Sequence, residues 1–113
     1  PWDSVSMDFI VGLPKTRNGF DSIVTFVDRL TKMVHLAPTT KTVTAKQVAD
    51  LFYHNVVRLH GCPLDIVSDR DSKFTGHFWQ ALSELTSIRS NMSSAHHPQS
   101  DGQTERLNRV IGD

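Results

Sequence analysis

The sequence predicts an α/β fold in which helices pack on a mixed β-sheet. Three observations lead to this class. The first third of the chain consists of apolar and β-branched segments separated by turn residues. The remainder alternates apolar residues at helical spacing with short apolar runs. With 38% hydrophobic and 21% charged residues in 113 positions, the composition is that of a single globular domain.

The first third of the chain is expected to form three strands of an antiparallel meander. The first run is mostly apolar, which suits a strand buried on both faces. Asn18-Gly19 is a strong turn pair between the first two runs, and Pro38 is expected to end the third. The three expected strands are Val5–Leu13, Ser22–Val27 and Met33–Ala37.

The clearest helix follows these strands. Thr44 and Gln47, three residues apart, form a capping box, and Gly61 and Pro63 provide the stop. Between them, apolar residues recur at the spacing of one buried helix face. These residues are Val48, Leu51, Phe52, Val56 and Leu59.

The second half of the chain is expected to add two strands and two helices. Thr75 can cap the first of these helices, whose buried residues would be Phe78, Trp79, Leu82 and Leu85. A polar loop, Ser93–Gln103, separates the last strand from the last helix. The expected strands are Leu64–Ser68 and Ser87–Met92, and the last helix is Thr104–Ile111. The resulting order, β-β-β-α-β-α-β-α, predicts a ribonuclease-H-like mixed sheet of five strands flanked by helices.

Three carboxylates stand out against this background. Asp8 interrupts an apolar strand, where an ionised carboxylate costs several kcal/mol unless it is paired, hydrated or metal-bound. Asp69 follows Ile66-Val67 at a strand end, and Glu105 opens the last helix. Each also has an ordinary explanation: an exposed or paired strand residue, a turn residue, and a helix pair with Arg109.

Taken together, the three carboxylates suggest metal-dependent phosphodiester chemistry. Convergent carboxylates suit Mg²⁺ or Mn²⁺, and two such ions about 3.5–4 Å apart can activate a water or a 3′-hydroxyl and stabilise the leaving oxygen. The formal net charge is zero, with twelve basic and twelve acidic residues, which argues mildly against a nucleic-acid partner. That argument weakens if acidic residues bind cations, because the metal reverses the local charge.

Three segments resemble the integrase cores of gypsy-class LTR retrotransposons, with retroviral integrases as more distant relatives. They are Met7–Ile10, Val67–Phe74 and His97–Asn108. Asp69 and Glu105 are separated by 35 residues, as are the second aspartate and the glutamate of the family signature. The resemblance implies that Asp8, Asp69 and Glu105 form a catalytic triad that binds two Mg²⁺ or Mn²⁺ ions. The implied reactions are 3′-end processing of element DNA and its transfer into target DNA.

The resemblance also implies partners and a location. DNA is the expected partner, homo-oligomers are expected in the full-length protein, and no membrane partner is expected. The action would be nuclear, after assembly in cytoplasmic particles, and the single cysteine, Cys62, fits a reducing compartment. Candidate DNA contacts, for which solvated charge or ion pairing is the alternative, are Arg70, Lys73, His97, Gln99, Arg106 and Arg109.

Some positions depart from the family pattern. Asp71 stands where the family usually has glycine, and it would either perturb metal binding or point to solvent. Ser87 and Ser90 replace a glycine and an apolar residue. Residues 1–113 are expected to be a partial core that lacks the final helices. Two other functions therefore stay open: a truncated or domesticated binding or dimerisation module without catalysis, and a ribonuclease-H-like nuclease that only hydrolyses.

The histidines and the cysteine do not predict a structural zinc site. Structural zinc needs four ligands at compact spacings. The pair His60 and Cys62, followed by scattered histidines, does not supply them. The candidate ligands for such a site are His54, His60, Cys62, His77, His96 and His97.

Overall fold

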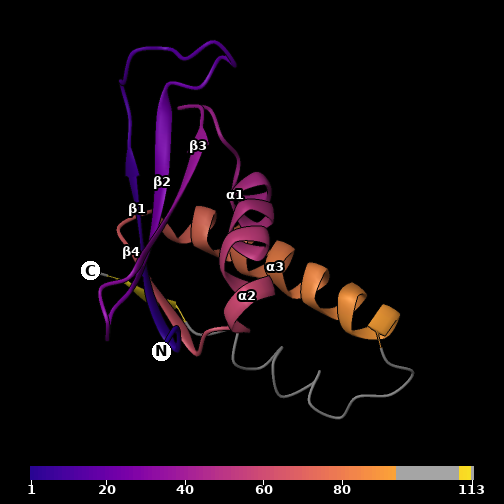
Figure 1. Ribbon diagram of the computed structural model, residues 1–113. Helices are drawn as coiled ribbons and strands as arrows, with labels where there is room; N and C mark the ends of the chain where they lie inside the picture. The colour runs from indigo at the N-terminus through magenta and orange to yellow at the C-terminus, as the bar shows by residue number, and fades with distance from the viewer. Residues whose placement is uncertain (94–109, 113) are drawn as a thin grey trace.

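The computed structural model describes residues 1–93 and 110–112, and in it a five-stranded mixed sheet forms one layer of the protein (Figure 1). The strand order is β3-β2-β1-β4-β5. The central strand β1 pairs antiparallel with β2 and parallel with β4. The strands are β1 (Ser4–Ile10), β2 (Ser22–Asp28), β3 (Val34–Thr39), β4 (Asp65–Ser68) and β5 (Val110–Gly112). The predicted mixed sheet is confirmed.

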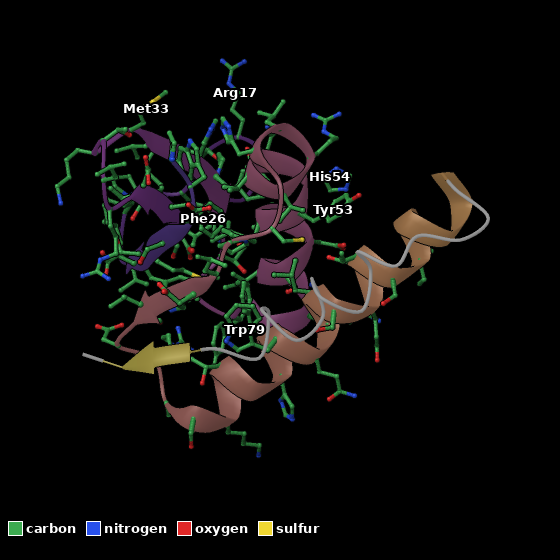
Figure 2. All side chains as sticks on the ribbon, turned by 90° about the horizontal axis from the view of Figure 1, so that it is seen from below. Arg17, Phe26, Met33, Tyr53, His54 and Trp79 are labelled. Atoms are coloured by element: carbon green, nitrogen blue, oxygen red, sulfur yellow. The ribbon has the colours of Figure 1, made fainter. Side chains whose placement is uncertain are left out.

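The described helices all lie on one side of this sheet (Figure 1). They are α1 (Ala45–Phe52), the π-helical segment η1 (Tyr53–Val57), α2 (Arg58–His60) and α3 (Ser72–Ser93). Figure 2 shows Phe26 and Trp79 in the layer between sheet and helices, where both are buried, whereas His54 lies on the outer side of its helix. None of the helices in the described ranges has the length and apolar character needed to span a membrane.

The capping box at the start of α1 is confirmed. The backbone N–H of Gln47 donates to Thr44 Oγ1 at 3.2 Å, and the backbone N–H of Thr44 donates to Gln47 Oε1 at 3.0 Å. Two otherwise unsatisfied donors are thereby satisfied. The helix buries Val48 and Phe52 completely, as its spacing predicts.

The π-helical segment changes which residues face the core at the end of this helix. A π-helical turn holds more residues than an α-helical turn, so the residues after it rotate relative to the α-helical stripe. Leu59 is 60% exposed, although its spacing predicted burial, and Val57 is buried instead. Gly61 then ends α2 with a φ of 88°, a conformation that favours glycine.

The third strand continues past the proline that was expected to end it. Pro38 lies inside β3 and is opposite Ile23 in the register. β3 is an edge strand, and an edge strand tolerates a proline whose missing N–H would face away from the sheet.

The end of the described chain differs most from the prediction. Ser87–Met92 is not a strand but part of α3, because burial at helical spacing continues through Leu82 and Thr86. The sheet edge beside β4 is taken by β5 instead, in which Val110 and Ile111 pair with Ile66 and Val67 of β4. These two β-branched residues were expected in the helix Thr104–Ile111, and residues 104–109 of that helix lie outside the described residues.

Candidate metal-binding site at the ends of β1 and β4

Asp8 lies on the sheet face that the described helices leave uncovered. Side chains alternate between the two faces of a strand, and Val5 and Met7 are buried against the helices. Asp8 therefore points to the other face, where it is exposed. The prediction that β1 is buried on both faces is wrong, and the cost of burying an ionised carboxylate does not arise.

Asp69 follows the last residue of β4 and lies level with Asp8. In the parallel pairing of β1 and β4, Met7 is opposite Ser68, so the next step along both strands brings Asp8 beside Asp69. Neighbouring strands are about 4.7–4.9 Å apart, so the backbones at these two positions are expected to lie close together. Both residues are exposed. The predicted neighbourhood of the two strands that position them, β1 and β4, is confirmed.

Neither carboxylate is used by the fold around it. Within the described part of the chain, no hydrogen bond or ion pair reaches the Asp8 or Asp69 side chain. The Thr25 hydroxyl donates a hydrogen bond to the backbone carbonyl of Asp8 at 3.3 Å, and not to its carboxylate. Two adjacent carboxylates without a compensating cation repel each other, and hard oxygen donors of this kind suit Mg²⁺ or Mn²⁺.

Arg70, the next residue, is held over two aromatic rings. Its guanidinium carbon lies 4.1 Å from the ring centroid of Phe74 and 4.9 Å from that of Phe9. The two rings meet edge to face at a centroid distance of 5.9 Å. The backbone N–H of Arg70 donates to the Ser68 hydroxyl at 3.2 Å. Stacking engages the face of a guanidinium and leaves the N–H donors at its rim available for an anion. The sequence reading missed this aromatic platform.

Asp71 caps helix α3. Its carboxylate accepts a hydrogen bond from the backbone N–H of Phe74 at 2.8 Å, and its carbonyl oxygen accepts one from the N–H of Thr75 at 3.1 Å. The side chain of Asp71 thus caps the helix. Neither predicted alternative, a perturbation of metal binding or a side chain that points to solvent, includes this role. The helix begins at Ser72, and the expected cap residue Thr75 instead donates its hydroxyl to the Ser72 carbonyl oxygen.

The other candidate residues divide between the first turn of α3 and the undescribed part of the chain. Lys73 is exposed in that first turn. Glu105, the third predicted ligand, lies outside the described residues, as do His97, Gln99, Arg106 and Arg109. Among residues 1–93 and 110–112, no three histidine, cysteine or acidic side chains gather as a metal-binding group. The described residues therefore provide at most two candidate ligands at this site, Asp8 and Asp69.

Comparison with known proteins agrees with this architecture. The family model "Integrase core domain" matches residues 1–98. The chain is 40% identical over 111 residues to the transposon Tf2-3 and Tf2-4 polyproteins of Schizosaccharomyces pombe. That match covers 98% of this chain but only 8% of each polyprotein, so the chain spans a small part of these relatives.

Solved structures share the fold at low sequence identity. The catalytic core of HTLV-2 integrase, in its dimeric form in complex with magnesium, superposes with a TM-score of 0.55 at 17% identity and covers 95% of this chain and 83% of that one. The simian T-cell lymphotropic virus intasome, in complex with a regulatory subunit of PP2A, gives 0.54 at 15% identity and covers 95% of this chain and 48% of that one. The predicted ribonuclease-H-like class is thereby confirmed.

Proposed function

The chain belongs to the integrase core domain family of the retrotransposon and retroviral type, and on that premise we propose that it cuts and joins DNA in a reaction that requires divalent cations. The observation that carries the proposal is the placement of Asp8 and Asp69. Asp8 lies in β1 and Asp69 directly follows the adjacent parallel strand β4, and both are exposed and free of hydrogen bonds or ion pairs from the described residues.

In this proposal Asp8, Asp69 and Glu105 hold two Mg²⁺ or Mn²⁺ ions. The two described carboxylates fit such ions because they are hard oxygen donors with no competing partner among residues 1–93 and 110–112. When bound, the ions would supply activation of a water or 3′-hydroxyl and charge stabilisation at the scissile phosphodiester. The chain's own contribution is to hold its carboxylates at the rigid ends of β1 and β4, so that the site is organised before DNA arrives.

Arg70 is proposed to bind a DNA phosphate at the same end of the sheet as Asp69; the Phe9 ring under its guanidinium packs against the core on the helix-covered face. Phe9 and Phe74 hold the guanidinium face, so the side chain loses little conformational freedom when its rim donors bind an anion. Lys73 is exposed in the first turn of α3 and can add a second, more flexible positive charge. Phosphate contacts of this kind position DNA without reading its sequence. The contacts proposed for His97, Gln99, Arg106 and Arg109 rest on the family resemblance alone.

The wider biological role is proposed from the family. The partners would be element ends and target DNA, the full-length protein would work as a homo-oligomer, and its site of action would be the nucleus after assembly in cytoplasmic particles. The match covers only 8% of each polyprotein relative, and we propose that residues 1–113 by themselves support simple nicking or disintegration at best.

A nicking and disintegration assay with Mn²⁺ tests the proposal. We expect weak metal-dependent cleavage by the native chain and none by Asp8→Asn or Asp69→Asn. Asp71→Asn is the matched control, because it removes a nearby negative charge while asparagine still caps a helix as well as aspartate does. This control should cleave like the native chain.

Each other outcome of this assay favours a different function. No cleavage by the folded native chain, even at high Mn²⁺, would favour a non-catalytic binding module. Cleavage without strand transfer would favour a nuclease that only hydrolyses. Robust concerted integration by this chain alone would contradict the proposal that it supports only simple reactions.

A further inference from the structure

Two histidines far apart in the sequence meet on the helix-covered side of the sheet. His35 lies in β3 and His60 is the last residue of α2. Their Nε2 atoms are 3.1 Å apart. His35 is opposite Phe26, which is opposite Met7, and both of these residues face the helices. The histidine pair is therefore on the opposite face of the sheet from Asp8.

A tryptophan holds the two imidazole rings in place. The indole of Trp2 stacks on His60 with ring centroids 4.6 Å apart and an interplanar angle of 10°, and it contacts His35 at 5.1 Å. Trp2 is only 3% exposed, and its backbone N–H donates to Asp28 Oδ1 at 2.9 Å. The carboxylate of Asp28 is buried and also accepts a hydrogen bond from the Thr31 hydroxyl. The imidazoles are thus positioned by packing as well as by each other.

The distance between the two Nε2 atoms suits a shared metal ion. Two neutral imidazoles that face each other through these atoms share a single hydrogen, so one ring donates and the other accepts. A transition metal about 2.0–2.1 Å from each nitrogen, with a ligand angle between a right angle and a tetrahedral one, places the nitrogens about 2.8–3.4 Å apart. The observed 3.1 Å lies within this range. A metal ion lies off the line between the two nitrogens, so each ring turns to aim its Nε2 lone pair at the ion, and the ring that had donated carries its hydrogen on Nδ1 instead.

We propose that His35 and His60 form a binding site for Zn²⁺, Ni²⁺ or Cu²⁺ that is separate from the carboxylate site. Imidazole nitrogen favours these ions, whereas Mg²⁺ and Mn²⁺ favour oxygen donors. Among residues 1–93 and 110–112 no third histidine, cysteine or acidic ligand joins the pair. Because His60 is exposed, water completes the coordination. The bound ion links edge strand β3 to the end of α2 and stabilises the fold by binding only the folded state.

The test uses the fluorescence of Trp2, which touches both ligands. Trp2 and Trp79 are the two tryptophans of the chain, so the Trp79→Phe variant leaves Trp2 as the single reporter. Ni²⁺ should quench this fluorescence saturably, and Zn²⁺ should compete with it and raise the melting temperature. In the same background, His35→Gln and His60→Gln should each weaken Ni²⁺ binding at least tenfold and abolish the Zn²⁺-dependent rise.

Two controls separate this site from its alternatives. His54→Gln changes an exposed histidine of the same helical segment and should leave Ni²⁺ binding unchanged. Asp69→Asn should also leave it unchanged, and millimolar Mg²⁺ should not compete, so failure of the proposed catalytic site and failure of this one are distinguishable. Equal quenching in the Trp79→Phe protein and in both of its histidine variants would overturn the proposal. So would the absence of saturable binding below millimolar Ni²⁺ while circular dichroism shows a folded chain.

Discussion

The capping role of Asp71 can be tested by three substitutions at that position. Its carboxylate accepts a 2.8 Å hydrogen bond from the backbone N–H of Phe74 at the start of α3. Losing a cap of this kind costs about 1 kcal/mol, and losing a negative charge near a helix N-terminus costs about 0.3–1 kcal/mol more. Asp71→Ala should therefore lower the free energy of unfolding by about 1–2 kcal/mol. For a domain of this size, that corresponds to a fall of about 4–8 °C in the melting temperature.

The other two substitutions at Asp71 separate the cap from the charge. Asp71→Asn keeps the cap and should cost about 0.3–1 kcal/mol, and Asp71→Gly should lose only a few tenths of a kcal/mol from the cap itself, because glycine is also accepted at this position. Glycine is what the family resemblance leads us to expect there. Urea unfolding at neutral pH measures all three free energies. An alanine variant as stable as the native chain, or an asparagine variant as unstable as the alanine one, would refute the capping role.

Three further predictions concern the core, a buried carboxylate and the proposed DNA contact. Leu82 is completely buried in α3, so Leu82→Ala should cost about 2–5 kcal/mol in urea unfolding; a loss below 1 kcal/mol would contradict the packing. The Thr31 hydroxyl, with backbone N–H donors and against the effect of burial, lowers the pKa of Asp28 from 3.8 to about 2. The ionised form of Asp28 therefore stabilises the fold above about pH 4, and this stability is lost as the pH falls through about 2. Asp28→Asn should remove that part of the pH dependence of the free energy of unfolding. The same pH dependence in the native chain and in Asp28→Asn would contradict this role of the carboxylate. Arg70→Gln should weaken duplex DNA binding and reduce the slope of the logarithm of the binding constant against the logarithm of the salt concentration by about 1. Arg70→Lys keeps the positive charge and should keep the slope. Equal slopes for the native chain and both variants would exclude a phosphate contact.

The sequence predicts the structure best where short residue patterns and the order of strands and helices point to the same arrangement. The capping box at Thr44 and the position of Asp69 at the end of β4 both follow from short local patterns. The parallel pairing of β1 with β4 then brings Asp69 beside Asp8, as the predicted order of strands and helices implies. Glu105 was placed by family spacing and lies outside the described residues, so its role stays a prediction.

Other features depend on geometry that local patterns do not carry. The π-helical segment exposes Leu59 and buries Val57, and residue spacing alone does not reveal such an insertion. The contact of His35 with His60 depends on the register of an edge strand and on where α2 ends. The cap at Asp71 was accessible in principle, because aspartate three residues before an apolar helix position is a common N-cap pattern.

Calorimetric titration with Mn²⁺ tests the central claim, that Asp8 and Asp69 hold divalent cations, most directly. The native chain, Asp8→Asn, Asp69→Asn and the matched control Asp71→Asn are compared at equal concentration, each shown to be folded by circular dichroism. The proposal predicts saturable binding by the native chain and by Asp71→Asn, and its loss in the other two variants. Native-like binding by Asp69→Asn, or no binding by the folded native chain, would contradict it.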